Sequence, residues 1–243
     1  MQASFLLDRV IPLFSMSLTL QACRLISAPL QQLAPAFEKA TGHKIVAAYG
    51  VTGKFYAQIR NGAPFEVLLA ADDETPARLA QEGAAVGATQ FTYAKGKLVL
   101  WSAKSAIVDD KGEVLKKGGF DHLALANPKL APYGAAALEA LKALGVLDAL
   151  APRFVTAENI SQAFQFTKSG NALLGFVALS QVMKDGQIAE DSAWIVPANL
   201  YQPIRQDAIV LDKGKGKPAA EALVKCLRSD QAKAIILSYD YAL

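Results

Sequence analysis

The 243-residue chain combines 52% hydrophobic with 19% charged residues, which excludes a disordered protein and allows one large domain or two lobes. Its 25 basic and 22 acidic side chains nearly cancel and are scattered along the chain, so we expect no nucleic-acid-binding surface. Cys23 and Cys226 lie far apart without metal-ligand spacing, so we expect two unpaired thiols and no metal site.

The N-terminal segment has two interpretations. Residues 1–22 contain an apolar stretch, with Arg9 before it and the small Ala22 after it, and this is typical of a secretory leader. Cys23 follows in "LQAC", so a lipoprotein anchor on its thiol is a further hypothesis. Alternatively, the alternating "SLTLQAC" is the first strand. No later stretch is apolar for long enough to span a bilayer.

The next part of the chain alternates between helices and strands. Hydrophobic periodicity predicts helix 28–40, strand 44–50, helix 53–62, strand 65–71 and helix 75–83. Gly42 is the expected C-cap of the first helix, and Asp72 and Asp73 are expected to cap the start of the third. Apolar strands between amphipathic helices indicate a parallel sheet covered on both faces.

A second set of elements follows a long predicted strand at 96–103. Its members are strand 122–128, helices 131–146 and 158–170, strand 172–179, and two closing helices within 218–241. Two α/β cycles joined by long strands indicate two lobes with a cleft. We expect an α/β fold whose parts are a leader at 1–22, lobe 1 at 23–103 plus 203–243, and lobe 2 at 104–202.

Enzyme signatures are missing from the sequence. It contains no nucleophile elbow, phosphate loop or dinucleotide fingerprint. Its two histidines, His43 and His122, stand beside predicted strands at surface-like positions without a partner motif, so we expect them to be solvated. We therefore expect a protein without catalytic activity.

Three predicted helices begin at points that suit an anion. Thr52 in "GVTG", Tyr133 in "APYG" and Ile160 in "AENIS" each stand at a helix start. The first N–H groups of a helix have no partner within it, and that end of the helix dipole is positive. An ordinary helix cap explains any single start. Their recurrence at matching points of two lobes favours a shared anion site.

Four long blocks resemble the periplasmic molybdate-binding proteins of bacterial ABC importers. The resemblance runs from about Ser27 to Tyr239 and is carried by "YGVTGKFYAQIRNGAPFEVLLAADD", "LALANPKLAPYG", "AENISQAFQFTKSGNALLGFVALSQV" and "PIRQDAIVL". It implies a two-lobed class II periplasmic binding protein fold, with a mixed, mainly parallel sheet flanked by helices in each lobe. It also implies an exported, monomeric receptor that needs no cofactor and delivers molybdate or tungstate to a membrane permease.

The resemblance implies specific ligands. The hydroxyl of Thr52 and the backbone N–H groups of Tyr133 and Ile160 match the family's binding positions. The family's first-strand Ser or Asn falls on Leu25, which has no side-chain donor, so Ser27 is the expected substitute.

Further departures leave alternatives open. Ala178 stands where some members have a ligand tyrosine, and the phenol of Tyr133 offers a replacement. Asp240 stands where relatives often have Ala or Gly, and we expect a cost if this position needs a positive φ. The alternatives are a receptor for another tetrahedral oxyanion, such as sulfate or a phosphonate, and a member with an impaired site. A cytosolic sensor domain of a transcription regulator would need a helix-turn-helix, which the sequence lacks.

Overall fold

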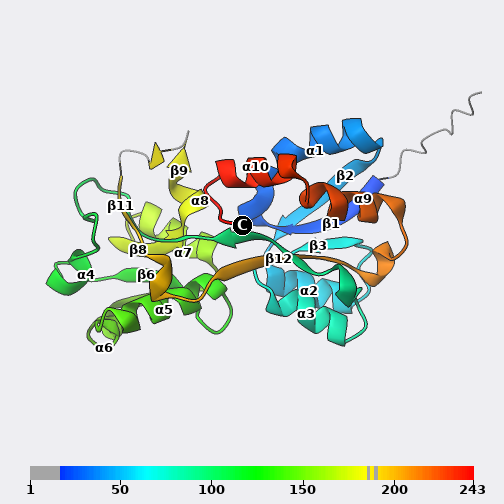
Figure 1. The fold of residues 1–243 in the computed structure, drawn as a ribbon. Helices are drawn as coiled ribbons and strands as arrows, with labels where there is room; N and C mark the ends of the chain where they lie inside the picture. The colour runs from blue at the N-terminus through cyan, green and yellow to red at the C-terminus, as the bar shows by residue number, and fades with distance from the viewer. Residues whose placement is uncertain (1–16, 185–186, 189–190) are drawn as a thin grey trace, which may run out of the picture.

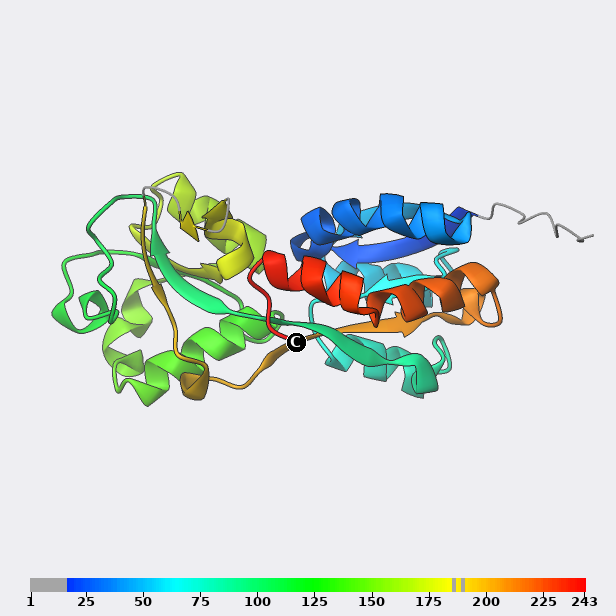
Figure 2. The same ribbon diagram turned by 45° about the horizontal axis from the view of Figure 1, so that its top comes forward.

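A computed structural model describes residues 17–184, 187–188 and 191–243. Two α/β lobes lie side by side, and the C-terminus lies between them (Figure 1). Extended segments cross from one lobe to the other (Figure 2). No helix among the described residues is long and apolar enough to cross a bilayer.

Lobe 1 contains a five-stranded sheet between two layers of helices. The sheet order is β2 (Lys44–Gly50), β1 (Ser17–Cys23), β3 (Val67–Leu69), β12 (Ile204–Val210), β4 (Phe91–Gly96). One face is covered by α1 (Ser27–Thr41), α9 (Pro218–Leu227) and α10 (Asp230–Ser238), and the other by α2 (Thr52–Arg60) and α3 (Glu74–Gln81) (Figure 1). Because side chains alternate along a strand, Val67 and Leu69 of β3 belong to the core on the side of α1, α9 and α10. Leu68 belongs to the core on the opposite side, with α2 and α3.

The stretch "SLTLQAC" forms β1, which confirms the strand interpretation. β1 pairs in parallel with both β2 and β3, and Leu18, Leu20 and Ala22 are fully buried. Residues 17–22, which we assigned to a leader, are therefore part of the core of lobe 1. The rest of that assignment, residues 1–16, lies outside the described residues. Cys23 is buried at the end of β1, so the structure gives no support to a lipoprotein anchor.

Lobe 2 repeats this plan. Its sheet order is β11 (Ser192–Ile195), β5 (Leu98–Ser102), β8 (Leu174–Ala178), β6 (Leu123–Ala126), β7 (Phe154–Ala157). Its helices are α4 (Val114–Lys117), α5 (Pro132–Ala143), α6 (Leu147–Leu150), α7 (Ile160–Lys168) and α8 (Leu179–Val182). Helix α5 packs on the sheet face that presents Leu100 and Phe176, and α7 stacks Phe164 on Trp101 at the other face, with 5.1 Å between ring centroids.

The remaining elements are short. Strands β9 (Met183–Lys184) and β10 (Gln187–Ile188) pair with each other. The 3-10 helices are η1 (Arg24–Ile26), η2 (Gly87–Thr89), η3 (Ala151–Arg153), η4 (Ala198–Leu200) and η5 (Asp212–Gly214).

Both sheets are mixed, which confirms the expected α/β class. Among the described strands, each five-stranded sheet has two parallel and two antiparallel pairings, so neither is mainly parallel. We expected lobe 1 to include residues up to 103. However, β5 pairs with β8 and β11 of lobe 2, so the chain first crosses from lobe 1 to lobe 2 at Lys97. The chain continues almost directly from β4 of lobe 1 into β5 of lobe 2. Such a change of sheet leaves no signal in the sequence.

The backbone confirms the predicted C-cap and gives the conformation of Asp240. Gly42 is left-handed, with φ 71°, and its N–H donates to Glu38 O at the end of α1. Asp240 has φ 64°, so a non-glycine residue occupies the left-handed region just after α10.

Candidate functional site

A small cavity lies between the two lobes. Lobe 1 contributes residues 23–25, 50–53 and 71–72, and lobe 2 contributes residues 130–133 and 159–161. The cavity measures about 60 Å³, whereas a single water needs roughly 10–15 Å³ and organic ligands occupy roughly 300–1,000 Å³. It therefore suits an ion of a few heavy atoms. A wider groove of about 670 Å³ adjoins it and shares Gly53, Asp72 and residues 130–132.

Three helices from the two lobes begin at this cavity. Thr52 is the first residue of α2, Tyr133 the second of α5 and Ile160 the first of α7, and all three line the cavity. Within the described residues, no hydrogen bond satisfies the backbone N–H of Thr52, Gly53, Tyr133, Ile160 or Ser161. The helix starts thus offer unpaired donors and positive dipole ends to one small space.

The hydroxyl of Thr52 is fixed in place. Its Oγ1 accepts the N–H of Ala71 at 3.0 Å, and the residue is 6% exposed. A threonine hydroxyl has one proton and two lone pairs, so this bond leaves the proton available for an acceptor. Thr52 therefore offers a second donor in addition to its backbone N–H.

Helix α7 has a reciprocal cap that leaves its first two N–H groups unused. The side chain of Asn159 accepts the N–H of Gln162 at 3.1 Å, and the side chain of Gln162 accepts the N–H of Glu158 at 2.7 Å. This arrangement holds the start of the helix rigidly. The cap satisfies neither Ile160 nor Ser161, both of which line the cavity.

Gly134 allows the start of α5 to lie close to strand β6. A Cβ on Gly134 would lie 2.1 Å from the carbonyl oxygen of Ala126, so only glycine fits there without movement of the backbone. This close approach seats the start of α5 on the end of β6 and brings the N–H of Tyr133 to the cavity wall.

The phenol of Tyr133 packs at the crossing between the lobes. Its hydroxyl accepts a hydrogen bond from Gln206 Nε2 at 3.4 Å, and a Cβ on Gly96 would lie 2.0 Å from it. Burial holds the pKa of this phenol well above its usual range, and nearby Tyr241 raises it further. The structure thus gives the phenol a partner at the crossing, while the backbone N–H of Tyr133 has none.

The structure does not bring Ser27 to the cavity. Its hydroxyl donates to Arg24 O at 2.8 Å, and Ser27 begins α1, after the turn η1 that follows β1. Leu25 does line the cavity, as its alignment with a family ligand implies, and its carbonyl accepts a hydrogen bond from the Tyr241 hydroxyl at 2.8 Å. The side-chain donor expected at this edge is therefore missing from both residues.

Two charged residues on the cavity wall were not predicted to belong to the site. Arg24 lines the cavity and is exposed, and its only sequence signal is its place beside the aligned ligand position. Asp72 caps α3 as predicted, since its Oδ1 accepts the N–H of Thr75 at 2.7 Å, and it also lines the cavity. Burial raises the pKa of the Asp72 carboxyl.

The expectation of two solvated histidines was wrong for His43. It is 8% exposed in the turn between α1 and β2, whereas His122 is exposed. Neither histidine lines the cavity. The part of the chain that the structure describes contains no cluster of three His, Cys, Asp or Glu residues able to hold a metal.

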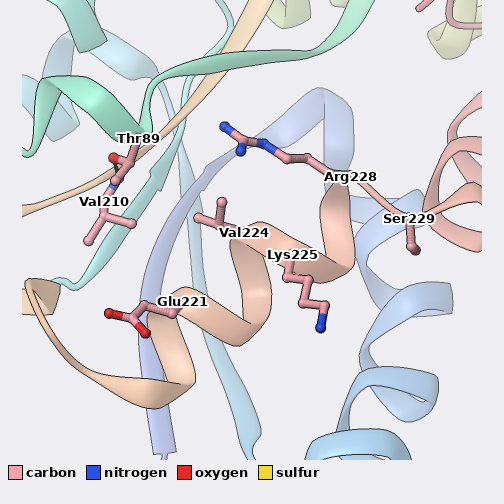
Figure 3. Close-up of a pocket in the computed structure, with 7 residues that line it drawn as sticks. All are labelled: Thr89, Val210, Glu221, Val224, Lys225, Arg228 and Ser229. Atoms are coloured by element: carbon pink, nitrogen blue, oxygen red, sulfur yellow. Dashed lines mark hydrogen bonds between the residues drawn. The ribbon is translucent and has the colours of Figure 1, made fainter.

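Another hollow, on lobe 1, lacks the converging helix starts of the cavity between the lobes. It measures about 520 Å³ and lies beside α9, where Val224 separates the carboxylate of Glu221 from the guanidinium of Arg228 (Figure 3). That guanidinium stacks on Phe91 at 4.2 Å from the ring centroid. None of the helix starts described above contributes to this hollow.

Comparisons with known proteins agree with this geometry. The sequence profile of a family described as bacterial extracellular solute-binding protein matches residues 18–242. The molybdate-binding protein ModA of Azotobacter vinelandii is 57% identical over 217 residues, which cover 89% of this chain and 86% of the relative. ModA of Rhodobacter capsulatus is 50% identical over 88% of this chain and 83% of its own length.

The solved structure of the Azotobacter vinelandii periplasmic molybdate-binding protein matches with a TM-score of 0.85 and 43% identity. The match covers 93% of this chain and 99% of that structure. This agreement confirms the two-lobed fold of class II periplasmic binding proteins that the sequence blocks predicted.

Proposed function

Because the chain belongs to the bacterial extracellular solute-binding protein family, we propose that it captures molybdate or tungstate between its lobes and delivers it to an ABC importer. The observation that carries the proposal is the convergence of three helix starts, from both lobes, on one small cavity. Relatives at 57% and 50% identity bear the name molybdate-binding protein, which supports this choice of anion.

The donors suit a bare dianion. Hydrogen bonds from N–H groups to an ionised acceptor are shorter than neutral ones and roughly twice as strong. Five main-chain N–H groups and the hydroxyl of Thr52 surround the cavity, and they replace the water that the ion loses. Because helix packing fixes these donors within each lobe, little reorganisation inside a lobe opposes binding.

Capture requires both lobes. Thr52 belongs to lobe 1, whereas Tyr133 and Ile160 belong to lobe 2, so the full donor set exists only when the lobes approach. Closure about the crossing strands would trap the ion, and the closed surface would meet a membrane permease. We propose that the protein acts as an exported monomer, without catalysis, without a cofactor and without binding nucleic acid.

Another tetrahedral oxyanion is the second candidate. Asp72 places a carboxyl group on the cavity wall, and a carboxylate is an acceptor for a protonated ligand such as hydrogen phosphate or a phosphonate. Sulfate has the same shape and charge as molybdate, so discrimination between the two depends on the fit of the cavity.

Calorimetric titration with molybdate, tungstate, sulfate and hydrogen phosphate tests the proposal. We expect heat of binding with the first two ions and little with the others. Binding of sulfate or phosphate without molybdate would transfer the function to the second candidate. Absence of heat with all four would refute an oxyanion receptor and support the impaired-site alternative.

A further inference from the structure

Arg24 is the basic residue on the wall of the proposed anion cavity. It stands in the 3-10 turn η1, directly after β1, and is exposed to solvent where the cavity begins. The first two residues of the turn are held in place, because Ser27 donates to Arg24 O at 2.8 Å and the Tyr241 hydroxyl donates to Leu25 O at 2.8 Å. The backbone of Arg24 therefore has a defined position.

The guanidinium of Arg24 differs from those of the other described arginines. The side chain of each of the others has a partner. Arg60 and Arg78 pair with Glu82, Arg205 pairs with Asp73, Arg153 donates to Phe120 O, and Arg228 stacks on Phe91. Within the described residues, the side chain of Arg24 has no such partner. An unpaired guanidinium beside an anion cavity is chemically suited to the anion itself.

The neighbouring residue makes this charge more important. Leu25 lines the cavity with an apolar side chain, and the hydroxyl of Ser27 is used at Arg24 O. Apart from Arg24, the donors around the cavity are neutral hydroxyl, amide or backbone N–H groups. A guanidinium presents five N–H donors in a planar fork and a full positive charge, both of which match a tetrahedral oxyanion.

We infer that Arg24 is a ligand-binding residue whose guanidinium pairs with the bound oxyanion at the edge of the cavity, where Leu25 provides no donor. This inference rests on the proposed function and adds a full charge to a site otherwise built from neutral donors. It follows that affinity depends on ionic strength, because an exposed guanidinium is screened by salt whereas enclosed N–H groups are not.

The test is calorimetric titration with molybdate at about 20 mM and about 500 mM NaCl, a range over which the Debye length falls several-fold. We expect Arg24→Gln to raise Kd by about tenfold or more at low salt and to remove most of the salt dependence. Arg24→Lys should keep the salt dependence but recover only part of the affinity, because it lacks the planar fork. Arg228→Gln is the matched control and should bind like the wild type.

A double variant separates a lost donor from damage to the turn. Adding Leu25→Ser to Arg24→Gln should lower Kd again without restoring the salt dependence, since it supplies a neutral donor beside the lost charge. If the wild type binds molybdate and Arg24→Gln shows the same Kd and salt dependence, the inference about Arg24 fails alone. If the wild type binds none of the oxyanions, the inference and the proposed function fail together.

Discussion

The hydroxyl of Thr52 is the group whose removal tests the cavity most directly. It accepts the N–H of Ala71 at 3.0 Å and retains a proton for the ligand. Thr52→Ala therefore removes two interactions, one present in the unliganded protein and one made only to the bound ion. These losses are reported by different measurements.

The loss inside the protein concerns stability. Without Oγ1, the N–H of Ala71 becomes an unsatisfied donor on a partly buried segment, which costs about 1–3 kcal/mol of unfolding free energy. In a chain of this length each kcal/mol lowers the Tm by about 2–4 °C.

The loss at the ligand concerns affinity. A hydrogen bond to a charged group is worth about 1.5–3 kcal/mol, so Kd for molybdate should rise about 10- to 150-fold.

Calorimetry for Kd and thermal melts without ligand separate the two effects. Thr52→Ser keeps the hydroxyl and should resemble the wild type in both, whereas Thr52→Val keeps the shape and should resemble alanine in Kd. An alanine variant that melts earlier but binds molybdate with the wild-type Kd would refute the reasoning. In that case the hydroxyl would serve only to join α2 to the segment after β3.

The remaining predictions concern the wall, the α5 start and β1. Asp72→Asn keeps the acceptor that caps α3 but removes a negative charge from the cavity, so we expect tighter molybdate binding at pH 7 by titration. Because burial raises the pKa of the Asp72 carboxyl above 3.8, the folded protein keeps this proton at pH values where the unfolded chain has lost it. As pH rises above 3.8 in chemical denaturation, the wild type should therefore lose unfolding free energy relative to the variant. Gly134→Ala forces a Cβ against Ala126 O and should weaken binding at least tenfold by displacing the α5 donors, or unfold lobe 2, as circular dichroism would report. A chain beginning at Ser17 should fold and bind, whereas one beginning at Cys23 lacks the central β1 and should not fold. Two lost leucines, at about 2–5 kcal/mol each, rival the whole stability of a domain.

Hydrophobic periodicity predicted the longer helices well, and some strands and the short helices poorly. The expected helices at 28–40 and 53–62 form as α1 and α2 with bounds shifted by a few residues. Strand β4 was not predicted, because "FTYAKG" carries a lysine and a glycine and is only partly buried. A secretory leader and a buried parallel strand are both short apolar segments, so the sequence left β1 ambiguous until its pairing was seen.

The main-chain donors of the site were predictable from the sequence, whereas the positions of its side chains were not. Helix starts at Thr52, Tyr133 and Ile160 are visible in sequence, and the structure brings them to one cavity. The displacement of Ser27 depends on the three-residue turn η1, which has no periodic signature. Arg24 was overlooked because the resemblance directs attention to neutral donors, and a cation at that place matters only once the cavity is known.

The contacts at the crossing reduce the entropy that closure of the two lobes costs. The hydroxyl of Tyr241 donates to Leu25 O in lobe 1 and accepts from Ser180 of lobe 2 at 3.4 Å. The left-handed turn at Asp240 directs the chain to that position, and backbone bonds between Ala242 and Lys95 hold it there. The C-terminal residues thus connect both lobes at the edge of the cavity, so part of the entropy of closure is lost on folding and not on binding. A bound ion can favour the closed form only to the extent that it binds that form more tightly than the open form. Donors divided between the lobes create that difference, which a site confined to one lobe would lack.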